Sequence, residues 1–241
     1  MPDFSNCRAV FIDIDDTLLD FDAYVENALR NGFEEFGLPP FTEEHMAVFT
    51  RENDLVWQEL EEGKIDYAML LEQRFDRIFR AMDLDCDGPA FEKYFKGGIY
   101  NFALPVEGAE DLLKYLSSKY IVCAASNGPY KQQLHRLDLA DMRKYFTHLF
   151  ISEDIGWAKP APEFYDKAMK ILGNGIENGI DNDEIVMIGD SITSDMKGAW
   201  NSSLRTILFD KNGKYPASFF EGREKRPDVI VKSLDEIKEF L

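Results

Sequence analysis

The chain has 241 residues, of which 45% are hydrophobic and 30% charged, a balance that supports a sizeable core and excludes a disordered chain. Its 27 basic and 45 acidic side chains give a net charge of −18. This charge argues against binding to nucleic-acid polymers or anionic membranes, because both normally require clustered Lys and Arg. No apolar stretch approaches the roughly 20 residues that span a bilayer.

The three cysteines, Cys7, Cys86 and Cys123, do not have the spacing of a metal site. Reduced thiols in a cytoplasmic protein are the simplest interpretation. The first residues show no basic region followed by a long apolar run, so no signal peptide is expected. We expect a monomer or a weak homodimer.

Five short apolar runs predict buried strands at residues 9–12, 120–125, 148–151, 185–188 and 205–209. They are nearly continuous in apolar residues, which is typical of strands covered on both faces of a parallel sheet. Helical patterns separate them, as at Ala109, Leu112, Leu113 and Leu116. The alternation predicts an α/β fold with a Rossmann-like, doubly wound parallel sheet.

The connection between the first two predicted strands is anomalous. It is about a hundred residues long and lacks a strand signal, whereas an ordinary crossover has ~10–30 residues. Its apolar and aromatic stripes have helical spacing and indicate the core of a helical bundle rather than the lining of a ligand site. We interpret residues 20–102 as an inserted helical domain and residues 1–19 and 103–241 as the catalytic core. Residues 173–183 and 209–226 are expected to be loops.

Polar and charged residues follow four of the predicted strands. They are Asp13, Asp15, Asp16 and Thr17 after the first, Ser126 and Asn127 after the second, Lys159 beyond the third, and Asp190 and Asp195 after the fourth. In an open parallel sheet these positions share the edge where ligands bind. Taken singly, each is typical of a solvated loop or a helix cap. Together they predict an active site.

These residue types suit phosphoryl transfer from a phosphate ester. Mg²⁺ prefers oxygen ligands and keeps several waters, so Asp13 and Asp190 can hold it, and Mn²⁺ suits the same oxygens. A carboxylate can attack phosphorus, and Asp15 can protonate the leaving alkoxide and later deprotonate water. The Ser126 hydroxyl, backbone N–H groups and Lys159 can hold the phosphoryl oxygens.

Four segments, FIDIDDTLL, AASNG, SEDIGWAKPAPEFY and VMIGDSITSD, resemble the four ordered motifs of the haloacid dehalogenase-like (HAD) hydrolase superfamily, over residues 9–210. The resemblance implies that Asp13 is the nucleophile and a metal ligand. It implies that Asp15 is the general acid/base and gives the metal its backbone carbonyl, that Asp190 is a further ligand, and that Asp195 orients metal-bound water. The phosphate is expected to contact Asp16, Thr17, Ser126, Asn127 and Lys159, and the inserted helices look like the family's cap.

Within this superfamily the motifs favour a phosphatase, because family dehalogenases usually lack the aspartate at position 15 and sugar phosphomutases more often read DxDG. The stretches DTLLDFDAYVENALRNGFEEFG, VWQELEEGKI and SNGPYKQQLHRL look like the pyrimidine 5′-nucleotidase branch, although that branch often has Asn-Ala-Gly where this chain has Asn201-Ser202-Ser203. We therefore expect Mg²⁺-dependent hydrolysis of a nucleoside 5′-monophosphate. The alternatives are a sugar phosphate or phosphoglycolate phosphatase, a phosphotransferase, a 2-haloacid dehalogenase, or a non-catalytic binding module.

Overall fold

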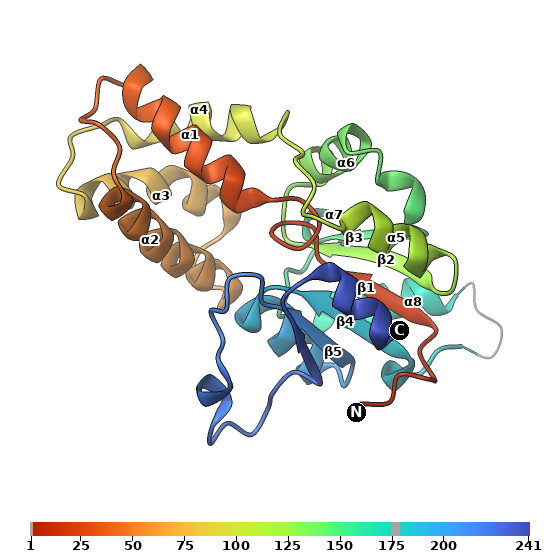
Figure 1. Cartoon of the computed structure of the whole chain (residues 1–241). Helices are drawn as coiled ribbons and strands as arrows, with labels where there is room; N and C mark the ends of the chain where they lie inside the picture. Colours follow the sequence, from red (N-terminus) through yellow and green to blue (C-terminus); the bar gives the residue numbers. More distant parts are fainter. Residues whose placement is uncertain (1, 175–178) are drawn as a thin grey trace. The chain divides into compact units, whose positions relative to one another are not determined.

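The computed structural model describes residues 2–174 and 179–241 (Figure 1). The chain divides into two compact units, one formed by Met1–Asp20 with Ala103–Leu241 and the other by Phe21–Phe102. The first unit contains the sheet, and the second is helical. In the described residues, no helix combines the length and the apolar character needed to cross a membrane.

The first unit is built on a parallel sheet. Within its described residues the sheet has six strands, β1 (Ala9–Ile12), β2 (Ile121–Ser126), β3 (His148–Ile151), β4 (Ile185–Gly189), β5 (Arg205–Phe209) and β6 (Val229–Val231), in the order β3-β2-β1-β4-β5-β6. Central β1 pairs with both β2 and β4, and Ile12 is in register with Ala124 and Ile188. The predicted doubly wound parallel sheet is confirmed, and the strand order reverses beside β1, where such folds bind ligands.

Strand β6 was not predicted from the sequence. It has only three residues, and Ile230 at its centre is 39% exposed, so its apolar run is too short and too one-sided for the pattern of a buried strand. The expected loop at residues 209–226 also contains a 3₁₀ turn, η4 (Ala217–Phe220). Strand β6 is the edge strand of the sheet, and η4 lies in the connection that leads to it.

Helices cover both faces of the sheet. Val10 and Ile12 face a core formed with α5 (Ala109–Ser117) and the 3₁₀ segment η5 (Leu234–Glu239). Ala9 and Phe11 face the opposite core, formed with α8 (Pro162–Gly173) and α9 (Lys197–Asn201). Because neither face of the strand meets water, its residues are apolar without alternation.

Shorter elements complete the first unit. They are α6 (Tyr130–Leu139), η1 (Arg143–Tyr145), α7 (Ser152–Ile155), η2 (Asn182–Glu184) and the π-helical turn η3 (Ile192–Met196). Of the loop expected at residues 173–183, the first residue belongs to α8 and residues 182–183 begin η2, while residues 175–178 lie outside the described part of the chain.

The second unit consists of α1 (Phe21–Glu35), α2 (Glu43–Glu61), α3 (Tyr67–Ala81) and α4 (Gly88–Ile99). The last three are preceded by the N-cap residues Thr42, Asp66 and Asp87, whose side chains accept a hydrogen bond from a first-turn N–H group. Phe33 and Phe75, which belong to the predicted stripes, lie in the buried core of this unit, together with Phe95 of α4, which the stripes did not include.

The chain leaves and re-enters the first unit at neighbouring backbone positions. The Asp20 N–H donates to the Leu104 carbonyl at 2.8 Å, and the Val106 N–H donates to the Leu18 carbonyl at 2.9 Å. Between these bonds, Leu19 forms an antiparallel bridge with Pro105. The segments on either side of the insertion are therefore tied together within the first unit.

Candidate active site

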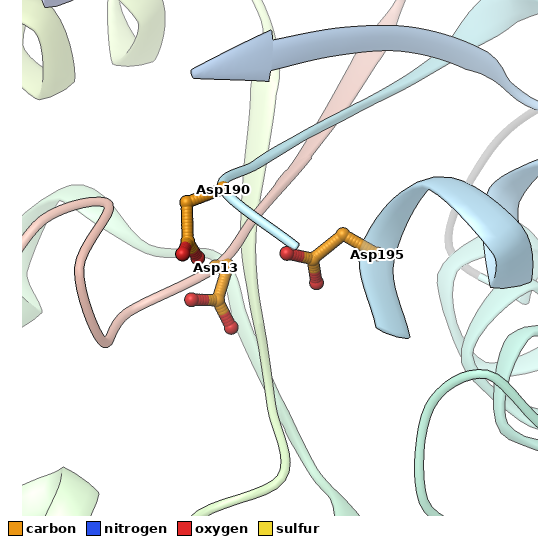
Figure 2. Close-up of side chains that lie close together, drawn as sticks. All are labelled: Asp13, Asp190 and Asp195. Atoms are coloured by element: carbon orange, nitrogen blue, oxygen red, sulfur yellow. The ribbon is translucent and has the colours of Figure 1, made fainter. Parts of the chain in front are cut away.

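Three carboxylates meet at the carboxyl ends of β1 and β4. Asp13 follows β1, Asp190 follows β4, and Asp195 lies in η3 (Figure 2). One carboxylate oxygen from each residue lies within 4.8 Å of those of the others. Asp13 and Asp195 are buried and Asp190 is half-buried. The residues at positions 13 and 190, predicted to share a site, therefore lie close enough to share one ion.

Asp195 approaches the cluster closely because residue 189 is a glycine. A Cβ atom at Gly189 would lie 2.1 Å from Oδ2 of Asp195, which no side chain could accommodate without displacing the carboxylate. The Ser191 N–H donates to the same oxygen at 3.1 Å. The π-helical turn that carries Asp195 is of a kind often found at functional sites. Backbone geometry thus fixes the third carboxylate of the cluster.

Lys159 supplies the positive charge among these carboxylates. Its Nζ lies 2.6 Å from Oδ1 of Asp13, from Oδ1 of Asp195 and from the carbonyl oxygen of Ala125. An ammonium group has three N–H donors, so all three are engaged. The side chain is 2% exposed. Lys159 therefore belongs to the site and not to the solvated surface.

Asn127 holds the backbone of Lys159 in place. Its Nδ2 donates to the Lys159 carbonyl at 2.8 Å, and its Oδ1 accepts from the Lys159 N–H at 2.8 Å. This pair of bonds ties the end of β2 to the loop beyond β3. The side chain of Asn127 is occupied by this contact, and its expected role at the phosphate stays a prediction.

The surroundings of the cluster favour the protonated form of two of its carboxyl groups. Burial raises the pKa of Asp13 to about 8, Lys159 opposes this shift, and Asp195 and Asp15 add to it. Burial also raises the pKa of Asp190 well above its ordinary value, and Asp195 and Asp13 add to the shift. Burial by itself would lower the pKa of Lys159, but Asp13 and Asp195 raise it overall.

These residues fit a hard divalent cation. Mg²⁺ takes oxygen ligands and usually binds through one or two carboxylates while it keeps several waters, and this cluster brings three carboxylates together beside the ammonium of Lys159. The resemblance implies that Asp195 orients metal-bound water; the structure brings its carboxylate into the same cluster as Asp13 and Asp190, and this role stays a prediction. The electrostatic cost of an anionic cluster would fall when a cation binds.

Asp15, the expected acid/base, is held by two side chains of α6. Its Oδ2 accepts from Nε2 of Gln133 at 2.6 Å, and its Oδ1 accepts from Nη1 of Arg136 at 2.5 Å. Gln133 and Arg136 are fully buried, whereas the side chain of Asp15 is 30% exposed. Neither α6 residue was identified as functional from the sequence. The available signal was their i, i+3 spacing shortly after the strand that ends at Ser126.

Ser126 is buried at the end of β2, beside Asp15. Its Oγ accepts from the Gly128 N–H at 3.1 Å and from Nε2 of Gln133 at 2.7 Å. A hydroxyl that accepts two hydrogen bonds still has its own hydrogen to donate. Ser126 is therefore preset as a donor, as its expected phosphate contact requires.

Asp16 and Thr17 have other surroundings. Asp16 has a φ of 58°, its N–H donates to the Leu19 carbonyl at 2.8 Å, and its carboxylate lies 3.6 Å from Nζ of Lys211. Thr17 is fully buried, and among the described residues its hydroxyl has no hydrogen-bond partner. Their expected contacts with the phosphate stay predictions.

Comparison with known proteins identifies relatives over most of the chain. Residues 7–201 match the family model of haloacid dehalogenase-like hydrolases. The pyrimidine 5′-nucleotidase PynA of Streptococcus pneumoniae is 32% identical over 204 residues, which is 84% of each chain. The glyceraldehyde 3-phosphate phosphatase of Pyrococcus furiosus is 29% identical and covers 97% of this chain and 92% of its own. The crystal structure of the HAD-hydrolase YfnB from Bacillus subtilis, bound to magnesium, covers 98% of each chain with a TM-score of 0.84 and 27% identity.

The doubly wound parallel sheet with carboxylates at its switch point defines an α/β protein whose ligand site lies at the carboxyl ends of β1 and β4. The family match over residues 7–201 shows that the chain belongs to the haloacid dehalogenase-like hydrolases, and its nucleotidase and phosphatase relatives show that it is a phosphoric monoester hydrolase. The resemblance predicted from the four motifs is confirmed.

Proposed function

We propose that this protein is a Mg²⁺-dependent phosphatase that hydrolyses small phosphate monoesters through an aspartyl phosphate on Asp13. The observation that carries the proposal is the cluster of Asp13, Asp190 and Asp195, in which the ammonium of Lys159 binds the carboxylates of Asp13 and Asp195. The carboxylates would hold Mg²⁺, which when bound supplies positive charge against the repulsion between a phosphate ester and an anionic nucleophile.

Two aspartates carry out the bond-forming and proton-transfer steps of the proposed reaction. A carboxylate oxygen of Asp13 forms a bond to phosphorus as the bond to the ester oxygen breaks, and Asp15 gives its proton to the departing alkoxide. Asp15 then takes a proton from the water that attacks the aspartyl phosphate, which releases inorganic phosphate and restores Asp13. The positive charge of Lys159, held 2.6 Å from Oδ1 of Asp13, stabilises the charge that develops on the phosphoryl group through space, and the Ser126 hydroxyl donates to a phosphoryl oxygen.

A nucleoside 5′-monophosphate is the substrate that we propose first, because PynA is a pyrimidine 5′-nucleotidase and the sequence resembles that branch. A sugar phosphate is the second candidate, supported by the similarity to a glyceraldehyde 3-phosphate phosphatase. The Cys7, Cys86 and Cys123 thiols are free, a state that suits work in the reducing cytoplasm.

A substrate panel tests the proposal. We expect hydrolysis of UMP, dUMP and dTMP with Mg²⁺, and its loss with EDTA, measured as released phosphate and compared by kcat/KM with glyceraldehyde 3-phosphate, phosphoglycolate and hexose phosphates. Sugar phosphates preferred by orders of magnitude would refute the nucleotide assignment and leave the phosphatase class intact. A phosphorylated acceptor formed with little free phosphate would indicate a phosphotransferase. The absence of turnover with every ester would refute the activity itself.

A further inference from the structure

We propose that Gln133 and Arg136 are positioning residues for the acid/base step, which hold the carboxylate of Asp15 and couple it to Ser126. This positioning role of the two side chains rests on the proposed function, because it requires that Asp15 protonates the leaving group. Neither is expected to contact the phosphorus or the water.

Gln133 is the centre of the network. Its Nε2 donates to Oδ2 of Asp15 at 2.6 Å and to Oγ of Ser126 at 2.7 Å, and its Oε1 accepts from Nη1 of Arg136 at 2.9 Å. A guanidinium group can only donate, so the carboxamide oxygen must face Arg136 and its NH₂ must face Asp15. One side chain thus links the expected phosphate donor to the expected acid/base.

Arg136 fixes the second oxygen of the same carboxylate. Its Nη1 lies 2.5 Å from Oδ1 of Asp15, so both carboxylate oxygens are bound by α6. Burying a guanidinium is costly unless a charge and hydrogen bonds compensate it. Arg136 is completely buried, so its position in the fold carries this desolvation cost. The contacts with Asp15 and Gln133 offset part of the cost, and they also fix the orientation of the Asp15 carboxylate.

The turn between β2 and α6 is shaped around Gln133. A Cβ atom at Gly128 would lie 2.6 Å from Nε2 and 2.7 Å from Cδ of Gln133, so only glycine leaves room for the carboxamide. The Gln133 N–H donates to the carbonyl of Pro129, which precedes the helix, at 3.0 Å. The first turn of α6 therefore fixes the backbone of Gln133, and Gly128 leaves the space that its carboxamide occupies.

Positioning matters because a general acid must lie within hydrogen-bond reach of the leaving oxygen, and such an acid contributes about 10²–10⁴-fold. The side chain of Asp15 is 30% exposed, and without the two contacts it would be free to adopt other rotamers that turn it away from the leaving group. Loss of the clamp should therefore slow esters that need protonation and spare esters that do not.

The test compares two leaving groups in the Mg²⁺-loaded full chain. The probes are p-nitrophenyl phosphate, whose phenolate leaves without a proton, and the best alkyl ester from the substrate panel. The value of kcat/KM reports only steps up to the first irreversible one, so the later role of Asp15 as a base does not enter. The ratio of the two values also cancels any loss of phosphate contact through Ser126, because that contact is common to both substrates.

The variants are Gln133→Met, which keeps length and apolar volume, and Arg136→Lys, which keeps a buried charge but loses the planar guanidinium. We expect kcat/KM for the alkyl ester to fall by about 10–100-fold and that for p-nitrophenyl phosphate to fall less than about threefold, as a fraction of the full acid effect. Gln132→Met makes the same chemical change one residue earlier on α6 and should leave both values near wild type. Thermal melting checks that each variant is folded.

Asp15→Asn provides the benchmark and separates the two possible failures. If it selectively slows the alkyl ester while Gln133→Met and Arg136→Lys change both substrates equally or not at all, the positioning role is refuted and the proposed function stands. If Asp15→Asn itself shows no dependence on the leaving group, the acid assignment fails and the positioning role fails with it. A selective effect in all three variants supports the proposal, and Gln133→Met alone decides if Arg136→Lys does not fold.

Discussion

Magnesium binding to this site should release protons, and the number of protons released follows from the raised pKa values of the carboxyl groups. The perturbation is a Mg²⁺ titration of the metal-free protein between pH 6 and pH 9. Carboxylates must be deprotonated to bind a metal, and the pKa of Asp13 is raised to about 8 by burial, with the nearby carboxylates of Asp195 and Asp15 adding to the shift. At pH 7 a group with this pKa is roughly nine-tenths protonated.

We therefore expect release of about one proton per Mg²⁺ at pH 7 from Asp13, with a further contribution from Asp190, whose pKa is also raised. The Kd should fall by about tenfold or more between pH 6 and pH 7 and become nearly constant above the raised pKa values. Isothermal titration calorimetry in two buffers of different ionisation enthalpy, PIPES and Tris, measures the proton count directly.

The same shift determines how the stability of the metal-free protein changes with pH. A carboxyl group whose pKa rises from 3.8 to about 8 on folding binds its proton more tightly in the folded chain. The metal-free protein should therefore lose stability as the pH rises from about 4 to about 8, and saturating Mg²⁺ should reverse the loss. Asp141→Asn, at an exposed position, is the matched control. A Kd independent of pH, with no proton released, would refute the charge balance inferred for this site.

Three substitutions test individual contacts by steady-state kinetics and Mg²⁺ titration. Asp13→Asn should keep the fold but abolish turnover, because an amide is a poor nucleophile and a poor metal ligand; activity within a few fold of wild type would disprove the nucleophile assignment. Lys159→Ala should lower kcat/KM by about 10²–10³, as loss of a preorganised group that stabilises the transition-state charge does, and an unchanged value would show that the lysine is only structural. Gly189→Ala should displace Asp195 and weaken Mg²⁺ binding by about 10-fold or more, as the loss of a metal-site contact does. Gly97→Ala, whose added methyl group meets nothing within 4 Å, should not, and equal affinities in the two variants would contradict the close packing of Asp195.

The strands nearest the site could be predicted from sequence because they are buried on both faces. An apolar run such as Ala9–Ile12 that ends abruptly in Asp13 marks both a strand and its functional end. The same logic located Ser126 and Asp190 at the ends of β2 and β4. Strand β6 could not be predicted in this way, because a three-residue edge strand is too short to show an apolar pattern.

The contacts around the site could not be predicted in the same way. Gln133 and Arg136 are polar residues on a short helix, and such residues normally belong to a solvated face. Their complete burial depends on how α6 packs against the end of β2, which no local pattern encodes. The approach of Asp195 likewise depends on the missing side chain of Gly189, a close contact visible only in three dimensions.

The backbone bonds from Asp20 to Leu104 and from Val106 to Leu18 have a consequence for protein engineering. They join the two segments that flank the inserted polypeptide, so these segments should keep their positions when the polypeptide between them is replaced. Closing a longer loop costs only about 0.6 kcal/mol for each doubling of its length. Exchanging Phe21–Phe102 for another folded module, or for a short linker, should therefore leave the carboxylate cluster assembled, which makes this junction a natural point for building chimeric hydrolases.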